Sequence, residues 1–422
     1  MANILWGLIP VVVSDVFNGI SVLTVIFFRF FTCGIVFLIL TIILIVYNNR
    51  YTSRSFISTK IFLDMLKTGN KDFKNIINFA YFGVLGFLGI IMQIIFYFLA
   101  LKLTSIGLVM LGFIMANVII AAYQHGRSEK LDVFKLIYLS MLIFSILIII
   151  YVKTTESSNF SLLGFGYIIG FTICLVFFHV FVNKDPYTQN ELKIINDNKN
   201  YKIARLLFKL SLMFLIGTFI MFAFLLLMLI IPFEPVLISE IHLFFDQLFD
   251  ITIFFRWEIL FIIVFSTIFP YLLVFFSYTN WSPYNLTYNQ WSSILTVVEP
   301  ITALLSGVLI VREYFPIEFL TITLFLLALS IVLRYIHERS VKVNACVLLS
   351  IKEGTMEELP LKLLTLGGIN RIDMLIGNHD MILTVKKSSI KDFYYLKEKL
   401  RNLEEIKKTT TLFINKVNKI SQ

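Results

Sequence analysis

The sequence predicts an α-helical membrane protein of ten spans, arranged as two inverted repeats of five helices and followed by a small α+β domain. Its composition differs from that of a soluble globular chain, with 58% hydrophobic residues and a mean hydropathy of +0.86. Apolar runs of about 20 residues, the length that crosses a hydrocarbon core, recur between polar loops. After Arg339 these runs stop, and the short alternating and amphipathic patterns of a soluble fold begin.

The apolar runs predict spans at 3–21, 25–47, 79–100, 104–124, 132–152, 161–183, 206–231, 257–278, 286–311 and 317–336. Lys and Arg are concentrated in the loops after the second, fourth and sixth spans and are sparse in the alternate loops. This asymmetry predicts a multi-pass protein of the cell membrane with both termini in the cytoplasm. The net charge of +9 is explained by basic loops beside anionic lipid, so the expected partner is the bilayer and no nucleic acid.

The loop at 232–256 is acidic and rich in Leu and Phe, and it is predicted on the outer side. Two interpretations are open. The segment is either a short amphipathic helix at the membrane interface or a lid over an exit path.

The third to fifth spans and the eighth to tenth spans share a layout. In each set a span is followed by a tight turn, a second span, an acidic turn and a final span. The acidic turns hold Glu129 and Glu313. Five spans per half is an odd number, so the two halves are expected to have opposite orientations, as in alternating-access transporters. The predicted domains are a first repeat at 1–155, a second repeat at 156–339 and a C-terminal domain at 340–422.

Several short motifs follow one another in the order of a known family. They are Trp6-Gly7 at the start of the first span, Arg29 near the start of the second, residues 97–102 after the third, and Glu299-Pro300 with Glu313 around the ninth. Over about residues 3–337 the chain resembles EamA-type members of the drug/metabolite transporter superfamily. It departs from them at 116–118, where Ala-Asn-Val replaces a proline. The resemblance implies a ten-helix, inverted-repeat exporter or exchanger of small metabolites.

Glu299, followed by Pro300, is the main candidate for a substrate-pathway residue. A carboxylate in a membrane span is costly, and a proline removes a backbone donor, so neighbouring helices or a wet cavity must compensate. Glu299 either accepts a proton or a cationic substrate group, or packs against a turn that Pro300 unwinds. For Arg29 the alternatives are an anchor that snorkels to the interface and a ligand contact.

Other polar and aromatic residues on the central spans share helix faces and together predict a polar cavity, although each alone is typical of contacts between helices. They are Gln93, Tyr97, Asn117, Tyr288, Gln290 and Trp291. Asp15 lies in the outer part of the first span and either lines the cavity or sits at the head-group boundary. No nucleotide-binding glycine loop, metal-ligand cluster or nucleophile elbow is present in the sequence. We therefore expect no enzyme activity, no cofactor and no metal.

The C-terminal segment predicts a βαββαβ order, which is that of a ferredoxin-like domain. Strands are expected at 341–351, 372–376, 381–385 and 406–414, because apolar residues alternate there. Helices are expected after Thr355, which forms a capping box with Glu358, and after Ser389. The sheet of so small a domain is easily completed by a second copy.

This segment resembles the ligand-binding domain of leucine-responsive/AsnC regulators, through the opening Val-Lys-Val-Asn-Ala at 341–345, the turn Gly377-x-x-Asp380 and the leucine-rich helix that follows. The resemblance implies a homodimer through the tail, with an amino-acid effector near the pairing surface, and marks Gly377 and Asp380 as the ligand turn. The alternative is that Gly377 only supplies a positive φ and Asp380 only caps the turn. The regulators' helix-turn-helix is absent, so DNA binding is not expected.

Three functions remain open from the sequence. The first is a secondary transporter of a small metabolite, such as an amino acid, with a cytoplasmic tail that senses amino acids and pairs. The second is a membrane receptor that keeps a transporter-like bundle without transporting. The third is a scaffold whose tail recruits a related soluble partner.

Overall fold

The computed structural model describes residues 1–14, 16–51, 56–70, 76–125, 133–155, 161–182, 188, 190–191, 194, 198–230, 235–279, 294–340, 343–352, 359–366, 368–387 and 390–413. The chain divides into two compact units, which are described separately. A helical unit comprises Met1–Ala121, Met141–Thr279 and Leu295–Ala328. A second unit comprises Ala122–Ser140, Asn280–Ile294 and Leu329–Gln422, and contains the C-terminal sheet.

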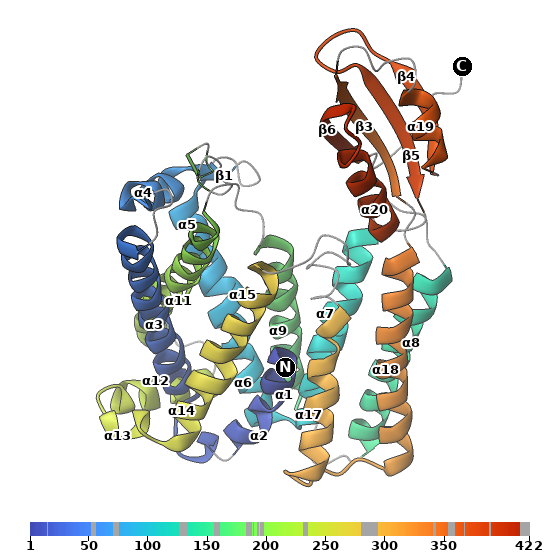
Figure 1. Cartoon of the computed structure of the whole chain (residues 1–422). Helices are drawn as coiled ribbons and strands as arrows, with labels where there is room; N and C mark the ends of the chain where they lie inside the picture. The colour runs from blue at the N-terminus through green and yellow to red at the C-terminus, as the bar shows by residue number, and fades with distance from the viewer. Residues whose placement is uncertain are drawn as a thin grey trace. The chain divides into compact units, whose positions relative to one another are not determined.

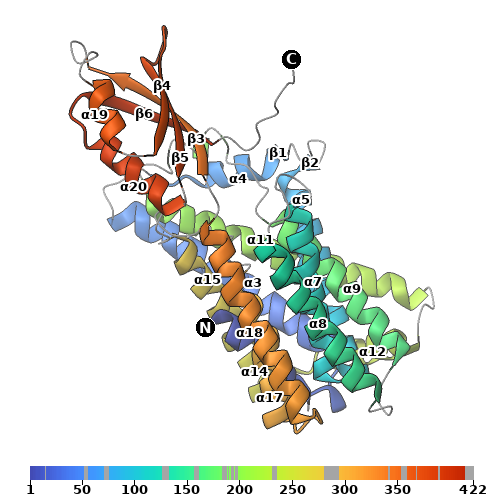
Figure 2. The same cartoon turned by 90° about the vertical axis from the view of Figure 1, so that its right-hand side faces the viewer.

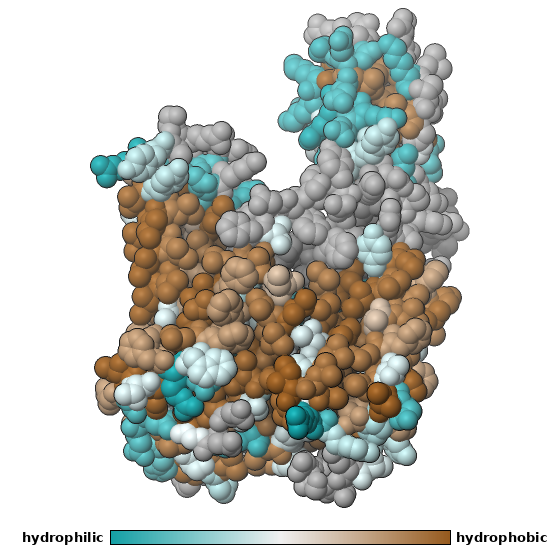
Figure 3. All heavy atoms as spheres, turned by 60° about the horizontal axis from the view of Figure 1, so that its bottom comes forward, coloured by the Kyte–Doolittle hydropathy of each residue, from teal (hydrophilic) through white to brown (hydrophobic). Residues whose placement is uncertain are grey.

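Among the described residues, seven helical stretches are long and apolar enough to cross a membrane: Val22–Tyr51, Asn78–Leu103, Val133–Thr155, Leu162–Phe181, Asn200–Ile230, Trp257–Val274 and Ile317–His337. The described apolar helices at Ala2–Ser14, Ile106–Ala122 and Val298–Leu309 are shorter. Large apolar side chains such as Ile43, Phe144 and Phe325 are exposed on these helices, and apolar residues predominate on the helical surface in Figure 3. This is the composition and surface expected of a membrane protein.

The prediction of one continuous helix over 3–21 is wrong. The segment forms α1 (Ala2–Gly7), α2 (Ile9–Ser14) and the 3₁₀ turn η1 (Val16–Asn18). Pro10 explains the break, because proline has no N–H to donate to the carbonyl four residues earlier and its ring clashes there.

Two other predicted spans contain a π-helical segment. The span at 79–100 is built from α5 (Asn78–Gly86), the π segment η3 (Phe87–Met92) and α6 (Gln93–Leu103). The span at 257–278 is built from α14 (Trp257–Ile263), the π segment η4 (Val264–Ile268) and α15 (Phe269–Thr279). These spans open the repeated layout that the sequence shows. A π segment loosens the regular backbone ladder and offers its carbonyls to other helices.

The helical unit packs through small residues at helix crossings. The helices α3 (Val22–Tyr51) and α11 (Lys199–Ile230) pack together (Figure 1), and the Ser211 hydroxyl donates to the Gly34 carbonyl at 2.9 Å. A Cβ atom at Gly86 would lie 2.0 Å from the carbonyl oxygen of Met213 on α11. Close backbone approach at glycine is the usual way that helices associate in lipid, where the hydrophobic effect does not drive them together.

The acidic loop at 232–256 contains two described helices, α12 (Pro235–Gln247) and α13 (Ile251–Phe254). The segment is therefore helical, and whether it lies at the membrane interface or covers an exit path stays a prediction. The sequence did not reveal how α12 is held. Glu240 is buried, and its carboxylate accepts from the Val22 N–H at 2.8 Å and from the Ser21 hydroxyl at 2.9 Å. It also pairs with Lys102 at the end of α6. A carboxylate thus lies at the N-terminus of α3, where the helix dipole favours negative charge.

Glu313 makes a similar contact at another helix start. Its carboxylate accepts from the Gly107 N–H at 3.1 Å, in the first turn of α7 (Ile106–His125), and lies 2.7 Å from the Lys153 ammonium. Lys153, near the end of α8 (Val133–Thr155), also donates to the Tyr314 carbonyl. Glu129, the acidic residue predicted in the first repeat, lies outside the described residues.

The ends that were predicted on the cytoplasmic side also contact one another. The Asn198 amide donates to Asn48 at 3.0 Å, and Tyr81 on α5 donates to the Phe181 carbonyl at the end of α9 (Leu162–Phe181). Glu191 pairs with Arg205. Because α11 begins at Lys199, the end of the loop predicted at 184–205 is helical. The loop predicted at 48–78 contains α4 (Thr59–Lys67) and the short strands β1 (Gly69–Asn70) and β2 (Ile76–Ile77).

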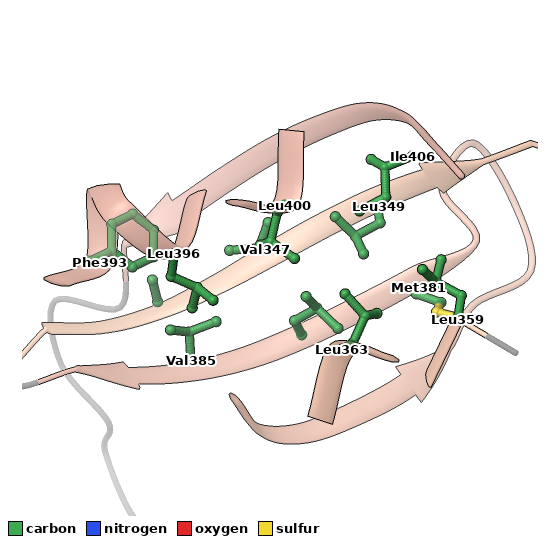
Figure 4. Packing of buried hydrophobic residues seen from close by; sticks show 12 residues of the cluster. Val347, Leu349, Leu359, Leu363, Met381, Val385, Phe393, Leu396, Leu400 and Ile406 are labelled. Atoms are coloured by element: carbon green, nitrogen blue, oxygen red, sulfur yellow. The ribbon is translucent and has the colours of Figure 1, made fainter. Parts of the chain in front are cut away.

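The C-terminal unit contains a four-stranded antiparallel sheet with the order β4-β5-β3-β6. Its elements in chain order are β3 (Val343–Ile351), α19 (Leu359–Thr365), β4 (Ile369–Met374), β5 (Met381–Lys387), α20 (Ile390–Arg401) and β6 (Ile406–Phe413). Both helices pack on one face (Figure 2), where alternate strand residues such as Val347 and Leu383 form a dry core with Leu363 and Leu396 (Figure 4). The predicted strands are confirmed, and the capping residues Thr355 and Glu358 lie outside the described residues.

Candidate functional site

Glu299 lies next to a break between two helical segments inside the helical unit. It is the second residue of α17 (Val298–Leu309), which follows a turn at Thr296 and Val297. Pro300 is therefore in the first turn, where its missing N–H would have no helical partner in any case, so the proline costs little. The Glu299 side chain is buried, with the residue 9% exposed. Within the described part of the chain, its carboxylate has no hydrogen-bond partner.

Arg29 lies on α3 and is 2% exposed, so the expectation that it snorkels to the interface is wrong. Its Nε donates to the Thr267 hydroxyl at 2.6 Å and its Nη2 donates to the Ser266 carbonyl at 3.2 Å. Nη1 is buried and has no hydrogen-bond partner among the residues that the structure describes. The guanidinium is thus anchored along one side and unsatisfied at one nitrogen.

Both anchors of Arg29 belong to the π segment η4. The Ser266 carbonyl also accepts from the Trp6 indole at 2.9 Å, so helices α1 and α3 converge on one carbonyl. The Ser266 and Thr267 hydroxyls donate to the Ile262 carbonyl at 2.7 and 3.1 Å. The locally widened backbone of η4 explains why its carbonyls are available to side chains from two other helices.

Aromatic side chains surround the charged pair. Tyr97 on α6 is buried against the rings of Phe113 and Phe171, at centroid distances of 5.6 and 5.2 Å. Tyr271 on α15 contacts Trp6 with ring centroids 5.6 Å apart. No ion pair within 4 Å joins Glu299 to Arg29. Helix α1 links the two, because Trp6 shares the Ser266 carbonyl with Arg29 and Gly7 packs against the Glu299 carbonyl oxygen. The site therefore combines α1, α3, α6, η4, α15 and α17.

Asn117 is buried on α7, where it holds the turn that precedes Glu299. Its amide donates to the Phe113 carbonyl at 3.0 Å, and its carbonyl accepts from the Thr296 hydroxyl at 2.8 Å. This contact ties α7 to the turn that precedes Glu299, which is how buried amides commonly join helices in membranes. Gln93 is half-buried at the start of α6. The other candidates, Asp15, Tyr288, Gln290 and Trp291, lie outside the described residues.

Gly7 is a site residue whose role the sequence did not explain. A Cβ atom there would lie 2.7 Å from the Glu299 carbonyl oxygen and 2.7 Å from the Cβ of Thr302. The Gly7 carbonyl also accepts from the Ser306 hydroxyl at 3.5 Å. Glycine at this position lets α1 approach α17 closely. This contact fixes the position of the Glu299 backbone relative to α1. The adjacent Trp6-Gly7 pair was the available sequence signal.

The predicted ligand turn of the tail has a definite local geometry. Gly377 has a φ of +144°, a conformation that favours glycine. The Asp380 carboxylate accepts from the Ile351 N–H at 2.7 Å, and the Ser350 hydroxyl contacts His379 at 3.1 Å. Both residues thus shape the turn beside the end of β3. Their role toward a ligand stays a prediction.

Comparisons with known proteins do not assign a family. No protein-family model matches the sequence, and no curated protein matches it. One solved structure that resembles this chain, described as "Crystal structure of protein", has a TM-score of 0.44 and 13% sequence identity. The match covers 81% of this chain and 96% of the other. Likeness at this level carries no argument about fold or function.

Proposed function

We propose that the protein is a secondary transporter, an exporter or exchanger, of a small metabolite. The bundle is a ten-span inverted repeat with both termini in the cytoplasm, and the substrate binds between Glu299, Arg29 and the surrounding aromatic residues. The observation that carries this proposal is the buried pair of Glu299 and Arg29, which come from opposite halves of the chain. Ionisable residues inside a membrane bundle are expensive and usually mark a substrate or ion path.

Three further features support a transport role. The two π segments lie in the spans that open the repeated layout, and α17 begins at the charged site after a break. Broken helices whose termini point at a mid-membrane site are typical of inverted-repeat transporters. The carboxylates of Glu240 and Glu313 each hold a helix start on the predicted outer side, with Lys102 and Lys153 beside them. Such contacts are able to break and re-form when the two halves move.

Replacing Glu299 with glutamine is expected to abolish substrate flux while leaving the fold intact. The change keeps the size of the side chain and removes its charge, so the electrostatic interaction with Arg29 is lost. We would measure exchange of radiolabelled amino acids in proteoliposomes, with Glu318→Gln as the control, because Glu318 is exposed in the first turn of α18 (Ile317–Ser340).

Full flux in Glu299→Gln would contradict the proposed pathway. A protein that binds the amino acid but never moves it would favour the receptor function.

For the tail we propose a ferredoxin-like domain that pairs with a second copy through its open sheet face and responds to an amino acid. The described strand order β4-β5-β3-β6, with a helix after β3 and another after β5, supports this proposal. The two helices cover only the face that contains Val347 and Leu383. The opposite face carries Leu348 on the central strand β3, with Ile382 and Thr410 paired beside it. A half-apolar sheet face is stabilised by burial against another layer.

Replacing Leu348 with arginine is expected to convert the purified dimer to a monomer, because it places a charge at the centre of the pairing face. The subunit number would be measured by analytical ultracentrifugation in detergent. Lys408→Arg, on the same face beside β3 but charged already, serves as the control. A Leu348→Arg protein that remains dimeric would show that the chains pair elsewhere.

A further inference from the structure

Resting on the proposed function, we infer that the site between Arg29 and Glu299 takes a zwitterionic amino acid, with the substrate carboxylate on Arg29 and its ammonium on Glu299. The inference depends on how the protein itself uses these two side chains. Each is buried, and each keeps a polar group that no described residue satisfies.

Arg29 supplies the anion-binding part of the site. Thr267 and the Ser266 carbonyl take Nε and Nη2, which fixes the plane of the guanidinium. Nη1 keeps both of its N–H groups without a partner among the described residues. A buried donor left unsatisfied is costly, and guanidinium stays charged at any physiological pH. A carboxylate is the group whose geometry and charge suit such a donor.

Glu299 supplies the cation-binding part. Its carboxylate accepts no hydrogen bond from any described side chain or backbone group, and it lies at the start of α17. It is not in contact with Arg29 as an ion pair. The two residues lie beside the same segment of α1, because Trp6 shares the Ser266 carbonyl with Arg29 and Gly7 packs against the Glu299 carbonyl oxygen. A ligand that carries one charge of each sign would satisfy both side chains.

The combination selects against simpler ligands. A purely cationic substrate would be attracted by Glu299 and repelled by Arg29. A purely anionic substrate would be attracted by Arg29 and repelled by Glu299. A ligand with one charge of each sign is neutral overall, so it enters a site of low dielectric at the least electrostatic cost. Tyr97, Tyr271 and Trp6 pack with one another or with neighbouring phenylalanine rings, and aromatic rings of this kind favour an ammonium or an apolar side chain beside them.

The test uses the full chain in detergent and matched ligand sets. The twenty proteinogenic amino acids are first screened by thermal stabilisation, and the best binder is then compared with its decarboxylated amine and its deaminated acid. We expect the amino acid to bind about tenfold or more tightly than either analogue, since each analogue leaves one buried charge unpaired. Absence of stabilisation by any amino acid, or equal binding of the three forms, would overturn the inference.

Charge-specific variants sharpen the result. Arg29→Gln is expected to weaken binding of the amino acid by about ten- to a hundredfold and to strengthen binding of the amine, because the repulsion by Arg29 is gone. Glu299→Gln is expected to weaken the amino acid by a similar factor and to strengthen binding of the acid. Arg29→Lys keeps the charge, and it tests charge recognition if Arg29→Gln fails to fold. If both variants still preferred the amino acid over the amine and the acid, the inference would be overturned.

Failure of this inference is distinguishable from failure of transport. Selective binding of the zwitterion without flux in proteoliposomes would sustain the ligand class and reject the transporter. Flux of an amine or an acid with no binding of amino acids would sustain the transporter and reject the ligand class.

Discussion

Replacing Gly86 with alanine is expected to destabilise the helical unit by about 3 kcal/mol or more, at the upper end of overpacking effects. The added Cβ would lie 2.0 Å from the Met213 carbonyl oxygen and 2.8 Å from the Met213 carbonyl carbon. Both are backbone atoms, so no side chain can rotate away to relieve the clash. The helices α5 and α11 must separate, and the packing on either side of the crossing is lost with them.

Gly166 on α9 offers a matched control for this prediction. A Cβ atom there would meet nothing within 4 Å, so Gly166→Ala should be neutral or slightly stabilising through helix propensity. The midpoints of thermal unfolding in detergent micelles would be compared for the two variants. If Gly86→Ala melted at the same temperature as Gly166→Ala, the close crossing of α5 and α11 would be disproved.

The positions of the membrane helices were largely predictable, because the length and hydropathy of a span are local properties. Seven predicted segments contain a described helix long and apolar enough to cross a membrane, and the described apolar helices in the other three are shorter. The breaks within the segments were not predicted. Pro10 was visible in the sequence, but its position relative to the helix start decides whether a proline is tolerated or breaks the helix. Pro300 shows the same outcome, because there too the chain begins a new helix just before the proline.

The candidate site was predicted in part. Glu299, Tyr97 and Asn117 are all buried, as polar residues between helices would be, and the polar cavity itself stays a prediction. Arg29 was expected at the interface because it lies near the start of its span. Its burial depends on the π segment η4, and hence on contacts between residues more than two hundred positions apart. Such contacts leave no periodic signal in a single sequence.

The tail was predicted more completely than the bundle. Alternation with a period of two fixes which residues of β3 and β5 face the helices, and the structure buries the expected set, including Val347 and Leu383. The ligand turn could not be settled in this way. The Asp380 carboxylate bonds the Ile351 N–H, and that tertiary contact is invisible in the turn's own sequence.

Replacing Glu240 with alanine is expected to reduce the stability of the protein by about 2–3 kcal/mol, which is below the usual cost of breaking a fully buried ion pair. The carboxylate accepts from the Val22 N–H and from the Ser21 hydroxyl, so its removal leaves the first turn of α3 without this acceptor. Lys102 loses its partner as well, but its side chain is 32% exposed and can reach water, which moderates the loss.

Three further variants separate these contributions by denaturant titration in detergent micelles. Glu240→Gln keeps an acceptor and loses the charge, so it should cost about 1 kcal/mol. Lys102→Met should reduce the stability by a similar amount, because Glu240 keeps its hydrogen bonds at the N-terminus of α3, the positive end of the helix dipole. Asp246→Ala, an exposed carboxylate on the same helix, should be nearly neutral. Equal losses in Glu240→Ala and Asp246→Ala would mean that α12 rests on the surface and does not hold the start of α3.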